Sequence, residues 1–407
     1  MKKNILLILL FVCVAVAGFS QETDTPEADT RETDLQETDT QETDSQEADT
    51  QEADSQEADV RESNAWETNL YTFFTNVIVT ERFRSSGFGF PLIGLVNIAK
   101  GNYSDAHLGL VNWNTGNFTG LQLGFVNTVG GSVTGMRAGF INTARGDENG
   151  LQIGFVNAAG GNENGLQTGF VNAIGGGANG IHIGFVNAIG GSGNGIHIGF
   201  VNAVGGSENG IQAGFVNIVA KETNGVQFGF VNVAAKGIHG SQTGFFNYAD
   251  RIERGVPIGF VSIVRHGGYQ AAEFSFSDFY PVQFAVKLGM EKFYTSIIGA
   301  YDFDRKDIAC GFGLGKIITV GNAFFLAPEI NFMNTTTDGR QMFLSLLPYF
   351  GYAVTRHLSI VFGPSVTWAH QFGGEVSEKP FFSIYEHTID SGNRITAGAK
   401  AGLRFRL

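Results

Sequence analysis

Twelve glycines recur at a strict spacing of 15 residues, and no insertion or deletion interrupts the series. Each glycine opens a tetrapeptide that reads GFVN or a close variant, as in Gly154-Phe155-Val156-Asn157. The series consists of Gly94, Gly109, Gly124, Gly139, Gly154, Gly169, Gly184, Gly199, Gly214, Gly229, Gly244 and Gly259. An uninterrupted period of this length is typical of repeat architectures, in which each unit packs on its neighbours. Residues 94–264 are therefore predicted to form twelve 15-residue repeats.

The composition of one repeat favours β-structure. After Gly180, the residues Ile181, Ile183 and Phe185 fall on one face of a strand, with Asn187 in line behind them. A glycine- and asparagine-rich segment then turns the chain, because these residues tolerate positive φ. The many glycines and the lack of a 3.6-residue period disfavour a helix. We expect the acidic side chains of the repeats to lie in the turns: Asp147, Glu148, Glu163 and Glu208.

Two β architectures fit this pattern. In a solenoid, each unit is one coil of roughly 50 Å contour. Equivalent residues then stack, so that asparagines such as Asn187 and Asn202 form a hydrogen-bonded ladder. In a meander, each unit is one strand of a membrane barrel. The constant unit length favours the solenoid, whereas two apolar strand faces with charges confined to turns favour the meander.

The N-terminal part of the chain contains a predicted export signal and a charged tract. Lys2 and Lys3 precede an apolar run and then small residues, which predicts a secretory signal peptide over 1–20. Residues 21–62 repeat an acidic pentapeptide and contain 17 acidic and two basic residues. Such a segment buries too little apolar surface to fold, so we expect a disordered linker. Aromatic and β-branched residues then predict one or two strands over 63–93 that lead into the repeats.

The net charge of −13 resides in the acidic tract. Residues 63–407 keep 22 acidic side chains (39 less 17) and 22 basic ones (26 less two in the tract and two in the leader). A neutral remainder disfavours nucleic-acid binding, which depends on positive charge.

From 265 to 407 the period disappears and long alternating strands follow. In the last of them, Ile395, Ala397 and Leu403 alternate with polar residues that include Lys400 and Arg404. A strand with an apolar and a cationic face is typical of an outer-membrane β-barrel, and about eight such segments suffice to close one. Aromatic residues near strand ends are expected in interfacial girdles, among them Tyr294, Tyr349 and Trp368.

The repeats also carry a family pattern. Gly150-Leu151-Gln152-Ile153 precedes a GFVN unit, and Gly255–Ser262 closes the series before the barrel-like strands. From about Trp66 to Leu407 the chain resembles a bacterial family of surface repeat-containing proteins. The resemblance implies an outer-membrane or surface location and outer-membrane lipid as a partner, and it supplies no biochemical activity. The acidic tract is not part of the family pattern.

No motif indicates catalysis, a cofactor or a metal site. Gly311–Lys316 superficially resembles a phosphate-binding loop, but its glycines alternate along a predicted strand and no helix follows. His182 and His197 are expected to stack about 4.8 Å apart in a solenoid, as a polar surface ladder rather than a metal site. Cys310, the only cysteine beyond the leader, is interpreted as a small strand residue.

The sequence thus favours a non-enzymatic surface protein with a display, adhesion or envelope-structural role, for an extracellular ligand that the sequence does not identify. The alternative is an outer-membrane pore or transporter, in which repeat and C-terminal strands close one large barrel. A secreted enzyme is the third hypothesis.

Overall fold

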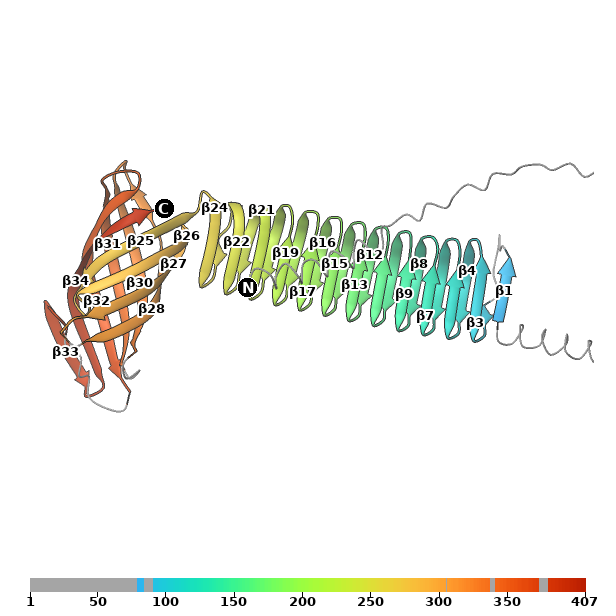
Figure 1. Ribbon diagram of the computed structural model, residues 1–407, viewed down its shortest axis with the longest axis horizontal. Coiled ribbons are helices and arrows are strands. Elements are labelled where there is room, and N and C mark those ends of the chain that lie inside the picture. The colour runs from blue at the N-terminus through green and yellow to red at the C-terminus, as the bar shows by residue number, and fades with distance from the viewer. Residues whose placement is uncertain (1–78, 84–90, 305, 337–340, 373–379) are drawn as a thin grey trace, which may run out of the picture. The chain divides into compact units, whose positions relative to one another are not determined.

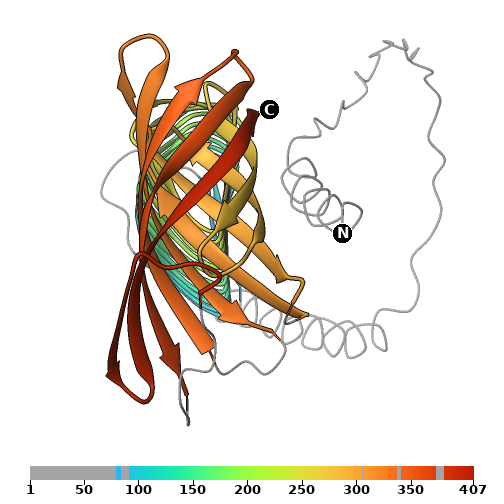
Figure 2. The same ribbon diagram turned by 90° about the vertical axis from the view of Figure 1, so that its left-hand side faces the viewer.

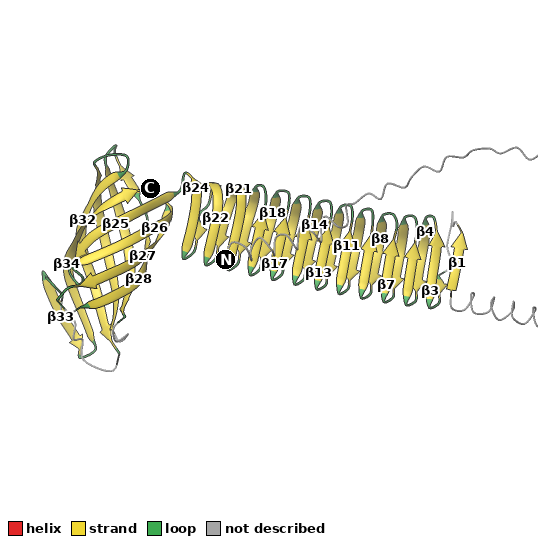
Figure 3. Cartoon of the chain, in the orientation of Figure 1, coloured by secondary structure: helices red, strands yellow, loops and turns green. Residues whose placement is uncertain are grey.

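The computed structural model describes residues 79–83, 91–304, 306–336, 341–372 and 380–407. The predicted signal peptide and acidic linker lie outside these residues. All regular structure in the described ranges is β-strand, so the predicted all-β class is confirmed (Figure 3). None of the described residues forms a helix long and apolar enough to cross a membrane. The chain divides after Gly161 into two compact units.

The first unit consists of stacked coils, each built from a strand of about four residues and a strand of about six. Strands two places apart in the chain pair in parallel with a register of 15, for example Tyr103 with Phe118 and Glu148 with Val133. The strands are β1 (Val79–Phe83), β2 (Leu92–Ile93), β3 (Val96–Lys100), β4 (Tyr103–Leu108), β5 (Val111–Asn114), β6 (Phe118–Leu123), β7 (Val126–Val129), β8 (Val133–Ala138), β9 (Ile141–Ala144), β10 (Glu148–Ile153) and β11 (Val156–Ala159).

The second unit begins with coils of the same kind, in which Ile181 pairs with Ile196, and Ile196 with Ile211. The strands of these coils are β12 (Glu163–Thr168), β13 (Val171–Ile174), β14 (Ala178–Ile183), β15 (Val186–Ile189), β16 (Gly193–Ile198), β17 (Val201–Val204), β18 (Glu208–Ala213), β19 (Val216–Val219), β20 (Thr223–Phe228), β21 (Val231–Thr243), β22 (Phe246–Arg254), β23 (Pro257–Ile258) and β24 (Val261–His266) (Figure 1). The solenoid is confirmed, and the meander alternative is wrong because the strands pair in parallel.

The glycine period follows from the close approach of successive coils. A Cβ on Gly184 would lie 2.6 Å from the Gly169 carbonyl oxygen and 2.8 Å from Nδ2 of Asn172. Gly180 has a φ of +138°, a region that side chains rarely adopt, and a Cβ there would collide with the Gly165 carbonyl oxygen. Any larger residue would push two coils apart.

The side chains that point inward and outward in each coil differ from those that strand alternation predicts. Asn187 is buried, whereas Ile183 and Phe185 are 41% and 45% exposed. The chain bends at Gly184-Phe185 between β14 and β15, and the bend resets the alternation of side chains. Placing Asn187 on the same face as Phe185 was therefore wrong.

The predicted asparagine ladder is confirmed. In the second unit, Nδ2 of Asn172 donates to Oδ1 of Asn187 over 2.8 Å, and Asn187 donates to Asn202 over 2.8 Å. The same atom of Asn187 also donates to the Ile198 carbonyl over 2.9 Å. The ladder continues through Asn217, Asn232 and Asn247 and ends on Ser262, and Asn97, Asn112, Asn127 and Asn142 form its counterpart in the first unit.

The second unit ends in a closed antiparallel barrel of eight strands (Figure 2). Its first and last strands pair with each other, with Ala271 opposite Arg406, which closes the ring. The strands in ring order are β25 (Tyr269–Ser277), β26 (Val282–Met290), β27 (Phe293–Asp302), β28 (Asp307–Gly315), β30 (Phe324–Thr335), β31 (Gln341–Ala353), β32 (Leu358–Gln371) and β34 (Asn393–Arg406). Two further strands, β29 (Ile318–Val320) and β33 (Tyr385–Asp390), pair with members of the ring.

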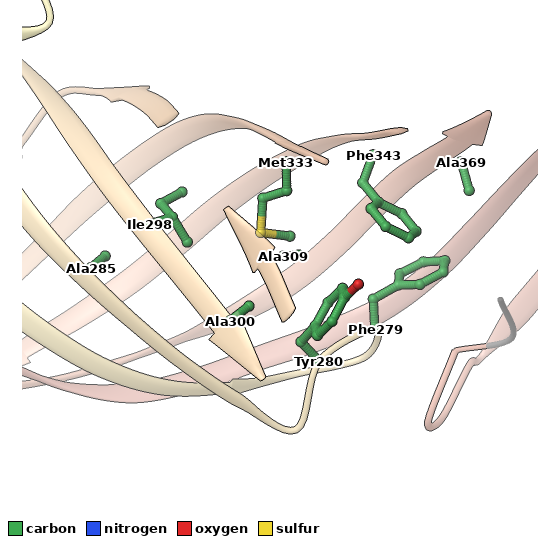
Figure 4. Packing of buried hydrophobic residues seen from close by; sticks show 9 residues of the cluster. All are labelled: Phe279, Tyr280, Ala285, Ile298, Ala300, Ala309, Met333, Phe343 and Ala369. Carbon is green, nitrogen blue, oxygen red and sulfur yellow. The ribbon is translucent and has the colours of Figure 1, made fainter. Parts of the chain in front are cut away.

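An apolar cluster fills part of the barrel interior. The β25–β26 turn contributes Phe279 and Tyr280, whose rings lie 4.8 Å and 5.9 Å from the Phe343 ring centroid. Met333 of β30 packs in the same cluster (Figure 4). These side chains are at most 5% exposed, so they close this part of the lumen.

We predict that Asn187→Ala weakens the solenoid. The change removes two buried hydrogen bonds and one partly buried one and leaves their partners one bond short, which costs about 3 kcal/mol. Hydrogen exchange followed by mass spectrometry should show about 100-fold lower protection of the amides in β15 and β17.

Asn194→Ala is the matched control. Asn194 belongs to a second ladder that is exposed, where it bonds Asn179 and Asn209. Solvent replaces these bonds, so the expected change is within about 0.5 kcal/mol. Equal loss of protection in both variants would contradict a stabilising role for the buried ladder.

Candidate functional site

The barrel encloses a cluster of five buried charges. Glu329 contacts Lys287 and Arg404, each at 2.7 Å from Oε1. Glu273 accepts a hydrogen bond from Nε of Arg404 over 2.8 Å and lies 3.4 Å from both Lys287 and Lys400. All five side chains are at most 3% exposed. Burial of charge is tolerated where opposite charges compensate it, and each of these five groups lies within 3.4 Å of an opposite charge.

Tyrosines complete this cluster. The Tyr294 hydroxyl donates to Oε1 of Glu329 over 2.6 Å, and the Tyr269 hydroxyl accepts from Arg404 over 3.3 Å. The Lys400 ammonium lies 5.5 Å from the Tyr349 ring centroid. Tyr294 and Tyr349 are fully buried, so the prediction that they form an interfacial girdle is wrong. Their side of the strand points into the barrel.

The last strand was interpreted correctly, since Lys400 and Arg404 are buried and Leu403 is exposed. The acidic partners Glu273 and Glu329 were missed. Their signal was present in the alternation: Glu273 precedes the outward Phe274, and Glu329 precedes the outward Ile330. A lone acidic residue on the polar face of a barrel strand therefore indicates a partner for the inward cations.

The outer face of the barrel is apolar on every strand of the ring. Side chains from all eight strands are 37–56% exposed. They are Phe274, Phe276, Phe284, Ile297, Phe312, Leu314, Ile330, Leu346, Phe350, Ile360, Phe362, Val366, Leu403 and Phe405, and we name this set the apolar belt. Exposed apolar surface of this extent marks contact with lipid or with a partner.

Part of the solenoid interior is polar, beside buried apolar residues such as Ile174, Ile189 and Val204, and the predicted positions of several titratable side chains were wrong. Glu163, Glu208, His182 and His197 are all fully buried, rather than placed in turns or on a surface ladder. Nε2 of His182 lies 2.5 Å from Glu163, Nε2 of His197 lies 3.3 Å from Glu208, and the two Nδ1 atoms are 3.1 Å apart. The ring centroids are 5.0 Å apart, as a stack of coils predicts.

The space for these groups comes from small residues in the adjoining coils. Ala178 and Gly193 occupy the positions equivalent to Glu163 and Glu208. A Cβ on Gly193 would lie 2.9 Å from Nε2 of His197. Each glutamate therefore reaches the histidine of the neighbouring coil, and the charged groups are paired across coils.

Two titratable side chains occupy the equivalent repeat position in coils of the first unit. Arg137 forms a buried ion pair with Glu148 and donates to the Thr143 carbonyl over 2.8 Å. Burial lowers the pKa of Arg137, and the Glu148 carboxylate opposes that shift. Burial also lowers the pKa of His107 to about 4, from an ordinary value of 6.5. Nδ1 of His107 lies 3.3 Å from the Gln122 side-chain amide.

Phenylalanine rings line one edge of the coils. In the second unit their centroids are 4.8–5.1 Å apart and the rings are nearly parallel. We name this set the phenylalanine stack: Phe170, Phe185, Phe200, Phe215, Phe230, Phe245 and Phe260. Their exposed fractions are 36–47%. The first unit carries Phe125, Phe140 and Phe155 in the same way.

The remaining sequence candidates lie apart from these sets. Gly311–Gly315 belongs to strand β28 and Lys316 follows it, so no helix end faces the segment. Cys310 is exposed on the same strand. Among the described residues, no group of three or more histidine, cysteine, aspartate or glutamate side chains is placed to hold a metal ion.

Comparison of the chain with protein-family models, with curated proteins and with solved structures gives no match. The geometry of the chain itself is therefore the basis for its proposed function. The barrel holds a closed network of charges, and the two solvent-facing features are the apolar belt and the phenylalanine stack.

We predict that acid weakens the first unit through His107. The folded state holds this ring neutral, so the unfolded state binds its proton more tightly between pH 6.5 and 4. Stability is full above pH 6.5 and falls as the pH falls, by about 3 kcal/mol at pH 4. Hydrogen exchange of β4 and β6, corrected for the intrinsic pH effect, measures this loss.

His107→Gln is the control variant, because glutamine fills the same column in Gln122. It should abolish this part of the pH dependence. A wild-type protein and a variant that lose protection equally on acidification would contradict the assignment to His107.

Proposed function

We propose that the protein is a non-enzymatic outer-membrane surface protein whose barrel is a lipid anchor. The apolar belt carries this proposal, because it surrounds a closed barrel whose interior holds the charged cluster around Glu329. Polar groups inside and an apolar outer band are the requirements for a strand barrel in a bilayer. The predicted signal peptide supports export, and the GFVN pattern supports membership of the surface repeat family.

In this proposal the solenoid is the part of the protein that is displayed for binding or assembly. Its described coils repeat one backbone geometry, and we propose display, adhesion or an envelope-structural role. Repeat stacks present extended surfaces on which the same side chain recurs at a fixed spacing. Such a surface suits binding or assembly rather than turnover of a small molecule.

The pore hypothesis has weaker support. Its original form needed the repeats as strands of one large barrel, and the repeats are parallel coils instead. In the eight-stranded barrel, the charged cluster around Glu329 and the apolar cluster around Phe343 occupy the interior. These side chains argue against an open path through the described barrel.

We predict that Leu346→Arg prevents barrel assembly. Leu346 lies near the middle of β31, opposite the outward residues Ile330 and Val366. A cation at the midplane of a barrel costs about 2–4 kcal/mol in lipid. The heat-modifiable, folded form in the outer-membrane fraction should fall at least about tenfold.

Asn194→Arg, which changes an exposed position in the solenoid, should leave this form unchanged. Recovery of the wild-type protein from buffer without detergent would overturn the membrane anchor. So would an undiminished folded fraction of Leu346→Arg.

A further inference from the structure

The phenylalanine stack is part of a continuous uncovered surface in the second unit. The column of residues just before the repeat glycines contributes Ile183, Ile198, Phe228 and Ile258, which are 41–46% exposed. Ile181 and Ile211 in the same strands are 41% and 39% exposed. These apolar side chains lie at one edge of the coils, and the exposed Asn179–Asn194–Asn209 ladder lies toward the opposite end of the same strands.

The area of this surface reaches that of a specific interface. A fully accessible phenylalanine presents about 200 Å², so seven rings at 36–47% exposure leave about 600 Å² in water. The six neighbouring apolar side chains raise the total to about 1,000 Å². A standard protein interface buries about 800 Å² on each partner. Monomers seldom expose an apolar patch of this size without a partner.

The chemistry of the surface disfavours recognition of anionic lipid headgroups. The two columns that form it contain no charged residue in the second unit: glycine and phenylalanine at the bend, and Thr168, Ile183, Ile198, Ala213, Phe228, Thr243 and Ile258 before it. Binding to anionic lipid headgroups depends on clustered lysine and arginine. A partner must therefore be recognised through shape and apolar contact.

The spacing of the rings restricts that partner further. They recur every 4.8–5.1 Å, which is the rise of stacked parallel strands. A partner stays in register over seven rings only if its own side chains recur with the same rise. A second copy of this chain meets that condition, and a two-fold interface needs the same patch on both subunits.

We propose that the phenylalanine stack, with its neighbouring isoleucines, is a self-association surface through which two solenoids of this protein pack side by side. The proposal concerns the coils alone and holds whether or not the barrel lies in a membrane. The partner is a second copy, and the contact is apolar and repeats at every coil.

Cysteine cross-linking tests the proposal in the full-length protein, with Cys13 and Cys310 replaced by serine. Single substitutions Phe170→Cys, Phe215→Cys and Phe245→Cys sample the two end regions and the centre of the stack. With a short bismaleimide, covalent dimers at all three positions indicate two solenoids in the same direction. Dimers at Phe215→Cys alone indicate opposite directions, because only the centre then meets its own copy. Either result supports the proposal.

Ser192→Cys, in the exposed turn between β15 and β16 at the other bend of the coil, is the matched control and should give no dimer. In Phe215→Cys, the further changes Phe185→Ser, Phe200→Ser and Phe230→Ser should lower the dimer yield at least tenfold. These changes touch only exposed side chains, and an unchanged circular dichroism spectrum confirms the fold.

Three outcomes would overturn the proposal. One is the absence of dimers at every stack position although a monofunctional maleimide labels the cysteines. The second is an equal dimer yield at Ser192→Cys, which indicates random collision. The third is a monomer whose Phe215→Cys thiol is shielded only when phosphatidylcholine vesicles are added, which assigns the surface to lipid.

Discussion

The parallel, in-register contact between coils is the constraint from which the rest of the solenoid follows. Because equivalent residues meet every 15 positions, a buried asparagine can bond its own counterpart, as Asn187 bonds Asn202 over 2.8 Å. Each amide of the ladder then serves as donor and acceptor at once, so the buried asparagines are hydrogen-bonded within the solenoid. The same contact leaves no room for a Cβ at Gly184, which explains the strict glycine period. This contact between coils therefore determines that the asparagines are buried and that the repeat glycines have no side chain.

The solenoid buries both polar and apolar columns, and a further set of apolar residues remains outside. In the solenoid, the bend at each repeat glycine turns the phenylalanine outward while asparagine, glutamine and histidine remain within. The barrel also has polar residues inside and apolar residues outside. Here the alternation of side chains along each strand puts Glu273 and Arg404 inside and the apolar belt outside. Under the proposed function, lipid covers the belt and a second copy covers the phenylalanine stack. These are different partners for surfaces of similar chemistry.

Much of the fold could be predicted from the sequence. The 15-residue period indicates stacked repeats, and the alternation of apolar and polar residues indicates barrel strands. The period predicted a stack of repeats that fitted either a solenoid with an asparagine ladder or a meander, and the last strand identified the inward Lys400 and Arg404. The predictions of which face a residue occupies were wrong where the chain bends, at positions such as Gly184, because the bend changes the face on which the following residues lie. Strand alternation alone therefore put Phe185 and Asn187 on one face. The burial of Glu163 and Glu208 was also missed, because it depends on a histidine one coil away and on the small residues Ala178 and Gly193, which only the stack brings together.

The most direct test of the central claim is an intramolecular cross-link between coils. Ile196 and Ile211 are partners in adjacent coils and both face outward. In Ile196→Cys/Ile211→Cys, a short bismaleimide should join the two thiols within one chain, and proteolysis with mass spectrometry should identify the bridged peptides. In an antiparallel arrangement these positions would lie about 20 Å apart. Failure of the pair to cross-link, although both cysteines react with a monofunctional maleimide, would contradict the parallel stack.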